Sequence, residues 1–138
     1  MRVTKDNINK FIEGSSMDCS NTGITHIEYI PDGITHLYCG VNKLTELPKL
    51  PESLTDLFCG DNRLTELPKL PESLTDLYCG GNRLTKLPLK FNHVRGYFNC
   101  GGNKLTTLEG APKSVAGHFN CRYNKILTFY NALFSKKL

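Results

Sequence analysis

The sequence lacks any apolar run long enough for a membrane span or for the core of a signal peptide. Residues 1–13 place Lys5, Asp6 and Lys10 among their apolar side chains, a pattern that does not fit a signal peptide. Nothing later approaches the roughly 18 consecutive apolar residues of a membrane-spanning helix. We therefore expect the protein in the cytoplasm, and this includes the cytoplasm of a host cell. Export by a route that needs no cleavable apolar signal is the alternative.

A large excess of one charge is also missing. The 138 residues hold 17 Lys and Arg against 13 Asp and Glu, a formal net charge of +4. This excess is too small to indicate a nucleic-acid binder from composition alone. Hydrophobic residues make up 39% and charged residues 22%, which is ordinary for a folded domain and excludes a disordered polar tract. The length predicts one domain, without room for a second, catalytic one.

No Cys-x-x-Cys pair is present, so the usual spacing of zinc ligands is missing. The cysteines recur instead at intervals of 20, 20, 20, 21 and 21 residues. They are Cys19, Cys39, Cys59, Cys79, Cys100 and Cys121. A fixed period of this size is typical of a solenoid, in which each repeat adds one turn.

The repeats share the pattern L-x-x-L-x-C-x-x-N-x-L, which is the leucine-rich-repeat signature with cysteine in its third apolar slot. Residues 49–68 and 69–88 differ at only 3 of 20 positions, which indicates recent duplication. The phrase LPKLPESL at residues 67–74 resembles the short leucine-rich repeats of secreted bacterial effectors, some of which carry a ubiquitin-ligase domain. The last two units, with YFNCGGNKL and HFNCRYNKI, look more like short repeat proteins of phages and large DNA viruses.

The resemblance covers roughly residues 15–129 and implies a leucine-rich-repeat solenoid with a parallel β-sheet on its concave face. It also implies a role inside a host cell, such as occupying or blocking a host protein. The ubiquitin-ligase domain of some effectors is missing, so that activity is not implied. We expect a single domain over residues 1–138, with about six repeats at 15–129 between helical caps at 1–14 and 130–138.

Strand periodicity assigns the side chains of each repeat to two faces. Leu57 and Cys59 are predicted to point into the core, and Phe58 outward. After each strand comes an asparagine whose amide could satisfy backbone groups of adjacent turns. We call Asn42, Asn62, Asn82, Asn103 and Asn124 the ladder asparagines. Prolines in the return segments favour an extended, polyproline-like convex face over helices. One extra residue between the apolar slots of the fifth and sixth repeats predicts a bulge.

Each candidate for chemistry has a structural explanation. We favour reduced cysteines that fill the core as small apolar side chains, and such thiols are poor nucleophiles. Asp56 and Asp76 share an outward slot about 5 Å apart and could serve glycoside hydrolysis or bind a cation. Duplication of one solvent-facing aspartate is the favoured explanation, because no other acid converges there. His36 and His118 share that slot four repeats apart. We therefore expect no catalytic, cofactor or metal site, and no enzymatic activity.

Aromatic side chains on the outward face give the leading functional hypothesis. Tyr38, Phe58 and Tyr78 form its central column, where they are not needed to fill the core. Exposed aromatic side chains commonly mark interfaces, although aromatic residues also simply suit strands. We therefore predict that this face binds a protein or peptide. The predicted binding residues are Tyr38, Phe58, Tyr78, Tyr97, Tyr123, His36, Asp56, Asp76 and His118.

A row of cations that follows the ladder asparagines gives the alternative hypothesis. We call Lys43, Arg63, Arg83, Lys104 and Lys125 the basic edge. Such a regular row could follow a phosphate backbone, or it could be a solvated edge copied with the repeat. Nucleic-acid binding through the basic edge therefore stays open, as does a structural, self-associating module.

Overall fold

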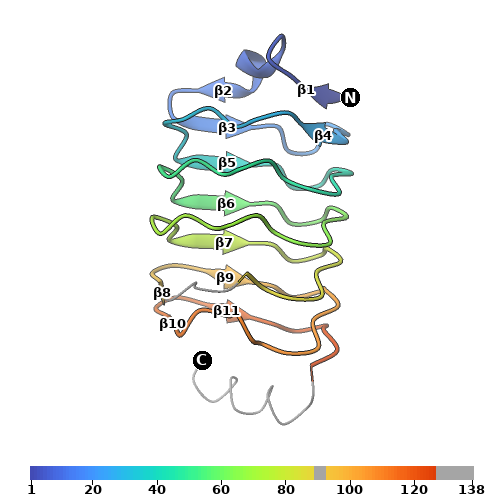
Figure 1. Ribbon diagram of the computed structural model, residues 1–138, viewed down its shortest axis with the longest axis vertical. Helices are drawn as coiled ribbons and strands as arrows, with labels where there is room; N and C mark the ends of the chain where they lie inside the picture. Colours follow the sequence, from blue (N-terminus) through green and yellow to red (C-terminus); the bar gives the residue numbers. More distant parts are fainter. Residues whose placement is uncertain (89–92, 127–138) are drawn as a thin grey trace.

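The computed structural model describes residues 1–88 and 93–126, which form a β-solenoid (Figure 1). Each turn contributes one short strand to a seven-stranded sheet with the order β11-β9-β7-β6-β5-β3-β2. Six of these strands pair in parallel, and β2 runs antiparallel to β3. In chain order the strands are β2 (Ile12–Glu13), β3 (Ser16–Asp18), β5 (His36–Tyr38), β6 (Asp56–Phe58), β7 (Asp76–Tyr78), β9 (Phe98–Asn99) and β11 (Phe119–Asn120). The predicted parallel sheet is confirmed.

The register of the sheet places equivalent residues of successive repeats side by side. Leu57 pairs with Leu37 on one side and with Leu77 on the other, and Leu77 pairs with Phe98. All four side chains are buried, and so is the cysteine that follows each of their strands. One apolar core of leucine, isoleucine and cysteine therefore runs along the described turns. The inward positions predicted from the alternation are confirmed.

The ladder asparagines fasten each turn to the one before it. The amide nitrogen of Asn62 donates to the carbonyl of Cys59 in its own turn at 3.1 Å and to that of Cys39 in the preceding turn at 3.0 Å. Its amide oxygen accepts the backbone N–H of Leu44, also in the preceding turn, at 3.0 Å. The same pattern recurs at Asn82, Asn103 and Asn124. The predicted polar ladder is confirmed.

The first repeat has Thr22 in place of a ladder asparagine and keeps part of this pattern. The hydroxyl of Thr22 donates to the carbonyl of Cys19 in its own turn at 2.6 Å. The backbone N–H of Thr22 donates to the amide oxygen of Asn42 in the next turn at 3.1 Å. Since β3 of this repeat pairs with the antiparallel β2 and not with the strand of a preceding repeat, a side chain that reaches only its own turn is sufficient here.

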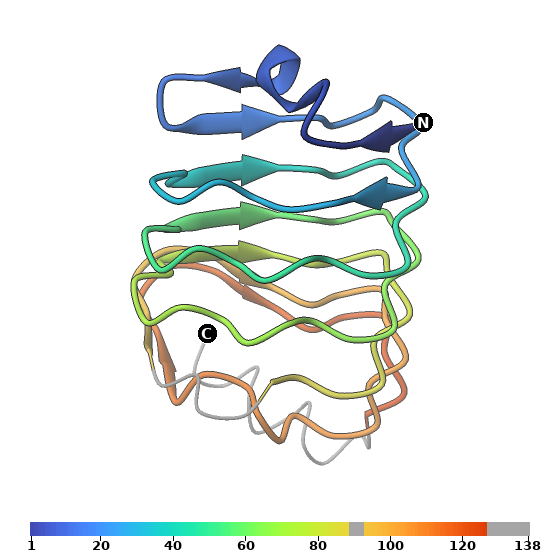
Figure 2. The same ribbon diagram turned by 45° about the horizontal axis from the view of Figure 1, so that its top comes forward.

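The return segments opposite the sheet are extended chain. Between β5, β6 and β7 the described chain contains no helix (Figure 2). The N–H of Leu54 donates to the carbonyl of Pro51 at 3.1 Å and closes the turn that leads into β6. Two short parallel pairs lie away from the main sheet: β1 (Arg2–Val3) with β4 (His26–Ile27), and β8 (His93–Val94) with β10 (Ser114–Val115). The extended path predicted from the prolines is confirmed.

The extra residue of the fifth repeat forms a bulge beside β7. Phe98 pairs with Leu77, and the N–H of Leu77 donates to the carbonyl of Tyr97 at 2.8 Å. Asp76 faces two residues of the next repeat, Gly96 and Tyr97, which is the two-against-one arrangement of a bulge. A Cβ on Gly96 would overlap the carboxylate of Asp76, so a larger residue there would have to displace that carboxylate from the Tyr97 N–H.

The N-terminal cap differs from the prediction. The sequence predicts a helical cap over residues 1–14, but the structure has only a short 3-10 helix, η1 (Ile8–Phe11), before the hairpin of β2 and β3. Gly14, with φ of +61°, makes the hairpin turn, and Ile12 pairs with Met17. The physical reason is that β3 would otherwise expose an unpaired strand edge, which a second strand can satisfy and a helix cannot. The cap predicted at 130–138 lies outside the described residues.

The cysteines lie in the core, as predicted. All six are in the reduced form, and Cys121 is the one that is not fully buried. Burial raises the pKa of the Cys19 and Cys79 thiols to about 12. It raises the pKa of Cys39 and Cys59 well above the ordinary thiol value. The neutral thiol is therefore the stable form in the core, which makes these cysteines poor nucleophiles.

Thiol labelling of the native protein at about pH 8 should modify Cys121 first and the five buried cysteines only slowly, because buried thiols are protonated and shielded. Denaturant should expose all six. A maleimide time course followed by mass spectrometry of the labelled peptides measures both rates. Fast labelling of Cys59, or intramolecular disulfides in freshly prepared native protein, would contradict this register.

Substitution of the ladder asparagines should destabilise the fold. Asn62→Ala and Asn82→Ala should each lower the free energy of unfolding by about 1–3 kcal/mol, because buried backbone groups lose their partners. Asn62→Thr, which copies the first repeat, should lose less. Thermal melts measure the changes, with the exposed neighbour Arg63→Ala as control, expected within about 0.5 kcal/mol of the unsubstituted protein. Unchanged melting temperatures for both alanine variants would show that the ladder adds no stability.

Candidate functional site

The outward face of the sheet carries the predicted aromatic column. Parallel pairing places Tyr38 beside Phe58 and Phe58 beside Tyr78. The ring centroids of Tyr38 and Phe58 are 5.1 Å apart with planes inclined by 13°, and those of Phe58 and Tyr78 are 6.3 Å apart with planes inclined by 28°. The column continues into Asn99 and Asn120. We call the three stacked rings the aromatic strip.

The aromatic strip serves the fold as well as the surface. Tyr38 and Phe58 are half-buried, and Tyr78 is 42% exposed. The ring of Tyr78 covers Gly60, where an added Cβ would lie 3.0 Å from the ring carbon Cδ1. Cross-strand aromatic pairs contribute roughly 0.2–1 kcal/mol each to a sheet. Stability therefore explains part of this aromatic content, and the remaining ring surface is open to a partner.

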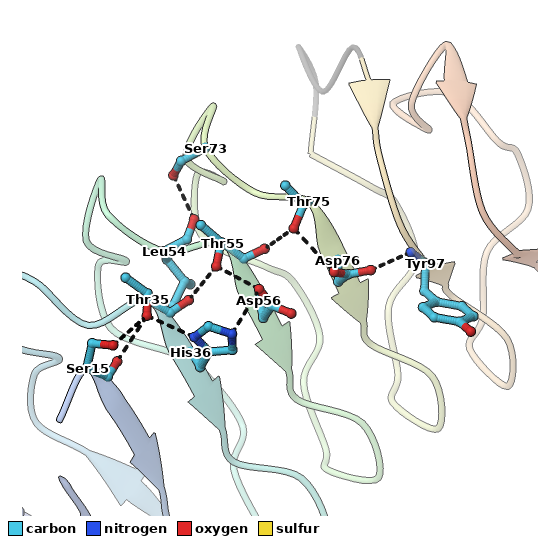
Figure 3. Close-up of polar contacts among 10 residues, drawn as sticks. All are labelled: Ser15, Thr35, His36, Leu54, Thr55, Asp56, Ser73, Thr75, Asp76 and Tyr97. Carbon is cyan, nitrogen blue, oxygen red and sulfur yellow. Dashed lines mark hydrogen bonds and ion pairs between the residues drawn. The ribbon is translucent and has the colours of Figure 1, made fainter. Parts of the chain in front are cut away.

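A second outward column lies directly before the inward-facing residue of β5, β6, β7, β9 and β11. Its members are His36, Asp56, Asp76, Tyr97 and His118. Figure 3 shows that His36 and Asp56 face each other from adjacent strands, with Nε2 of His36 3.5 Å from Oδ1 of Asp56. Nδ1 of His36 lies 2.8 Å from the hydroxyl oxygen of Thr35, and the hydroxyl of Thr55 lies 2.6 Å from Oδ1 of Asp56. Asp56 thus belongs to a side-chain network on the sheet surface.

Asp76 has a different role, because the next repeat binds it through its backbone. Its Oδ1 accepts the N–H of Tyr97 at 2.6 Å, and the hydroxyl of Thr75 lies 3.2 Å from its Oδ2 (Figure 3). The carboxylate therefore holds the bulge in place and fixes the backbone that carries the tyrosine ring. Asp56 and Asp76 therefore have different structural roles, although the repeats that contain them are nearly identical in sequence. In residues 1–88 and 93–126, no group of three or more His, Cys, Asp or Glu could hold a metal ion.

The sheet face is hollowed over β7, β9 and β11 into a groove of about 820 Å³. Beside it the rings of Tyr97 and His118 stack, with centroids 5.3 Å apart and planes inclined by 8°. Tyr97 is 53% exposed and Tyr123 is 85% exposed. We call this surface the C-terminal groove; it is lined chiefly by Tyr78, Tyr97, Asn99, His118, Asn120, Arg122 and Tyr123. It brings together four of the predicted binding residues, whereas Tyr38, Phe58, His36, Asp56 and Asp76 lie outside it.

Asn99 and Asn120 each bind a backbone N–H of their own turn through the side-chain oxygen. Oδ1 of Asn99 accepts the N–H of Gly101 at 2.9 Å, and Oδ1 of Asn120 accepts the N–H of Arg122 at 2.9 Å. Because each oxygen is bound within its turn, the nitrogen is the atom left for a ligand. Asn99, Asn120 and Arg122 are not among the binding residues predicted from the sequence. The sequence signal that could have indicated this role is an asparagine that stands two residues before a turn.

Tyr123 is presented by a turn residue in the left-handed conformation. Its φ is +58°, and the equivalent residues Val41 and Asp61 have φ of +55° and +54°. Glycine takes this position in two other repeats, as Gly81 and Gly102. The conformation costs most non-glycine residues roughly 1–2 kcal/mol, so the turn imposes it on whichever residue occupies the position. The Tyr123 side chain is thereby held out into solvent.

The basic edge is exposed and regular in the structure. The N–H of each member donates to the preceding turn, as from Arg63 to the carbonyl of Leu44 at 2.8 Å, so the row advances by one strand spacing of about 4.8 Å per repeat. All five side chains are exposed. Within the described chain none of them forms an ion pair with a carboxylate. Their role in binding stays a prediction.

No protein-family model matches the sequence, and no curated protein does. The fold, however, matches solved structures. The leucine-rich-repeat domain of a Shigella effector aligns with a TM-score of 0.74 and 26% identity, over 87% of this chain and 53% of that chain. This chain has the fold of a leucine-rich-repeat solenoid. YopM from Yersinia enterocolitica WA-314 aligns with a TM-score of 0.48 and 25% identity, over 81% of this chain and 34% of that chain.

The resemblance to bacterial effector repeats that rests on LPKLPESL is confirmed. The leucine-rich-repeat chain spans about half the length of the Shigella structure that it matches. The likeness of its last two units to repeat proteins of phages and large DNA viruses stays a prediction. None of the helices described is long and apolar enough to cross a bilayer.

Asp56 and Asp76 offer a matched test of the bulge. Asp76→Ala should lower the free energy of unfolding by about 1 kcal/mol more than Asp56→Ala, because only the first removes the acceptor of the Tyr97 N–H. Asp76→Asn keeps an acceptor oxygen and should recover part of the loss. Denaturant titrations of the three variants measure the difference. If both alanine variants are equally destabilised, the bulge does not depend on this carboxylate.

Proposed function

We propose that this leucine-rich-repeat chain is a non-enzymatic interaction module that binds a protein or a peptide through the outward face of its sheet. The observation that carries the proposal is the aromatic strip of Tyr38, Phe58 and Tyr78, which leads toward the exposed Tyr97 and Tyr123. A few large aromatic side chains often account for most of the binding energy of an interface. The stacked rings are held in place before binding, which reduces the entropy lost on association.

The second column would supply the polar contacts of this interface. His36 and Asp56 face each other beside the aromatic strip, and His118 stacks on Tyr97. Asp76 contributes indirectly, since its carboxylate is bound to the backbone of Tyr97. Together with Tyr123 these residues make up the proposed binding surface.

The dimensions of the face favour a short ligand. Five gaps of about 4.8 Å between six parallel strands give a sheet about 24 Å long, with roughly 500 Å² of outward surface. A standard protein interface buries about 800 Å² on each partner. The face therefore suits an extended segment of a partner, with the adjoining turns adding contacts for a larger one.

The similarity to the leucine-rich-repeat domain of a Shigella effector supports a protein partner. In its more specific form, the proposal is that the chain acts as a host-directed effector or inhibitor in the cytoplasm of a host cell. It would do so by occupying or blocking a host protein.

The basic edge supports a second candidate function, nucleic-acid binding. Its five exposed cations advance by one strand spacing per repeat and are not paired with carboxylates in the described chain. A row of this kind can neutralise successive phosphates, and its affinity would fall steeply with salt. Self-association through the aromatic strip is a third candidate, which analytical ultracentrifugation over a range of concentrations would detect.

Peptides selected from a random display library provide ligands for the test. Tyr38→Ala/Tyr78→Ala should weaken their binding by about tenfold or more at both about 50 mM and about 300 mM salt, because apolar anchors are lost. Arg63→Ala/Arg83→Ala should cost less, because exposed charges are screened. Isothermal titration measures the affinities, and circular dichroism checks the fold. If only the arginine variant loses affinity, and if the affinity of the unsubstituted protein falls steeply in high salt, the basic edge is favoured as the binding surface instead.

A further inference from the structure

The C-terminal groove presents hydrogen-bond donors from several of the side chains that line it. Asn99 and Asn120 offer amide nitrogens, because their oxygens are bound within their own turns. Arg122 adds a guanidinium with five N–H donors, and Tyr97 and Tyr123 add hydroxyls. None of the described residues that line the groove is acidic. Such a surface matches a ligand that is rich in negatively charged oxygen.

The charge of the chain divides at the same place. Residues 1–76 hold 7 cations against 12 acids, a formal net charge of −5. Residues 77–138 hold 10 cations against a single acid, Glu109, a formal net charge of +9. The groove lies over β7, β9 and β11, at the basic end of the solenoid. Long-range attraction would therefore bring an anionic ligand to the same end as the donors.

We propose that the C-terminal groove binds an acidic segment of a protein partner in extended form. This inference rests on the proposed function in that the ligand is a protein. Asn99 and Asn120 stand one strand spacing apart, about 4.8 Å, so their amides can meet successive oxygens of such a segment. Arg122 would take a carboxylate, for which a guanidinium provides paired donors. The exposed rings of Tyr97 and Tyr123 would cover the apolar parts of its side chains.

The geometry favours an acidic peptide over a nucleic acid. Tyr97 and His118 stack on each other, so the ring faces that they share are closed to bases. The basic edge, which would follow a phosphate backbone, contributes none of the described residues that line the groove. Amide donors, by contrast, serve both the carboxylates and the main-chain carbonyls of an extended peptide.

Fluorescence anisotropy with a labelled decaglutamate peptide tests the proposal. A decapeptide of alternating glycine and serine is the neutral probe, and a ten-nucleotide oligothymidine is the nucleic-acid probe. At about 50 mM salt, where charge attraction is weakly screened, the unsubstituted protein should bind decaglutamate more tightly than either probe. Absence of decaglutamate binding, or tighter binding of oligothymidine, would overturn the proposal.

Two double variants with the same change of net charge locate the site. Asn99→Asp/Asn120→Asp keeps an acceptor oxygen for each turn but replaces both amide donors by carboxylate oxygens. Arg83→Gln/Lys104→Gln removes two charges from the basic edge. The first variant should weaken decaglutamate binding by about tenfold or more and the second by less than about threefold. Equal losses would show attraction by net charge alone and would overturn the proposal.

A single exposed substitution keeps the test valid if the asparagine variant folds poorly. Arg122→Gln should weaken decaglutamate binding several-fold more than Arg83→Gln, since only Arg122 lines the groove; equal effects would overturn the proposal. Failure here is distinguishable from failure of the proposed function, because Tyr38 lies outside the groove. If display-selected peptides bind the Tyr38→Ala variant more weakly and decaglutamate does not bind at all, the proposed function stands and the acidic ligand is rejected.

Discussion

The structure depends on the asparagine amides that join one turn to the next. The leucines and cysteines of the core supply most of the apolar burial, but burial has no direction and would accept many stackings of the turns. Each ladder asparagine instead bonds to backbone groups of two turns at once, as Asn62 does with Cys59 and Cys39. These bonds lie where the strand ends, so they determine which residue of one turn meets which residue of the next. The remaining features of the surface follow from that register.

A fixed register converts a sequence period into columns of side chains. The aromatic strip and the basic edge both arise because every turn presents the same positions in the same direction. Identical positions do not stay equivalent, however. Asp56 faces His36, whereas Asp76 is bound by the backbone of the bulged repeat. The bulge therefore separates a regular N-terminal part of the face from a C-terminal part that is hollowed and rich in donors.

Periodic features could be predicted from the sequence because the same residue types recur at the same spacing in successive repeats. Leu57, Cys59 and Asn62 recur in the same order, and the parallel sheet, its inward residues and the ladder follow directly. The N-terminal cap could not be predicted in this way, since the helical spacing of Ile8 and Phe11 competes with a strand edge that only the folded sheet creates. The C-terminal groove was missed for a related reason. It depends on the bulge, which Asp76 of the adjacent turn holds, and on amide orientations that backbone N–H groups of the same turn set.

The left-handed turn position has a consequence for how such a chain can diversify. Its occupants in the six repeats are Asn21, Val41, Asp61, Gly81, Gly102 and Tyr123, which share a positive φ and little else. The backbone there is set by the neighbouring turns, and most of these side chains reach solvent. Exchange of one occupant for another thus alters the exposed chemistry, at a conformational penalty that is near zero for glycine and roughly 1–2 kcal/mol for most other residues. Each repeat therefore contains one position whose residue type can change while the backbone of the solenoid stays the same, as in a recognition loop.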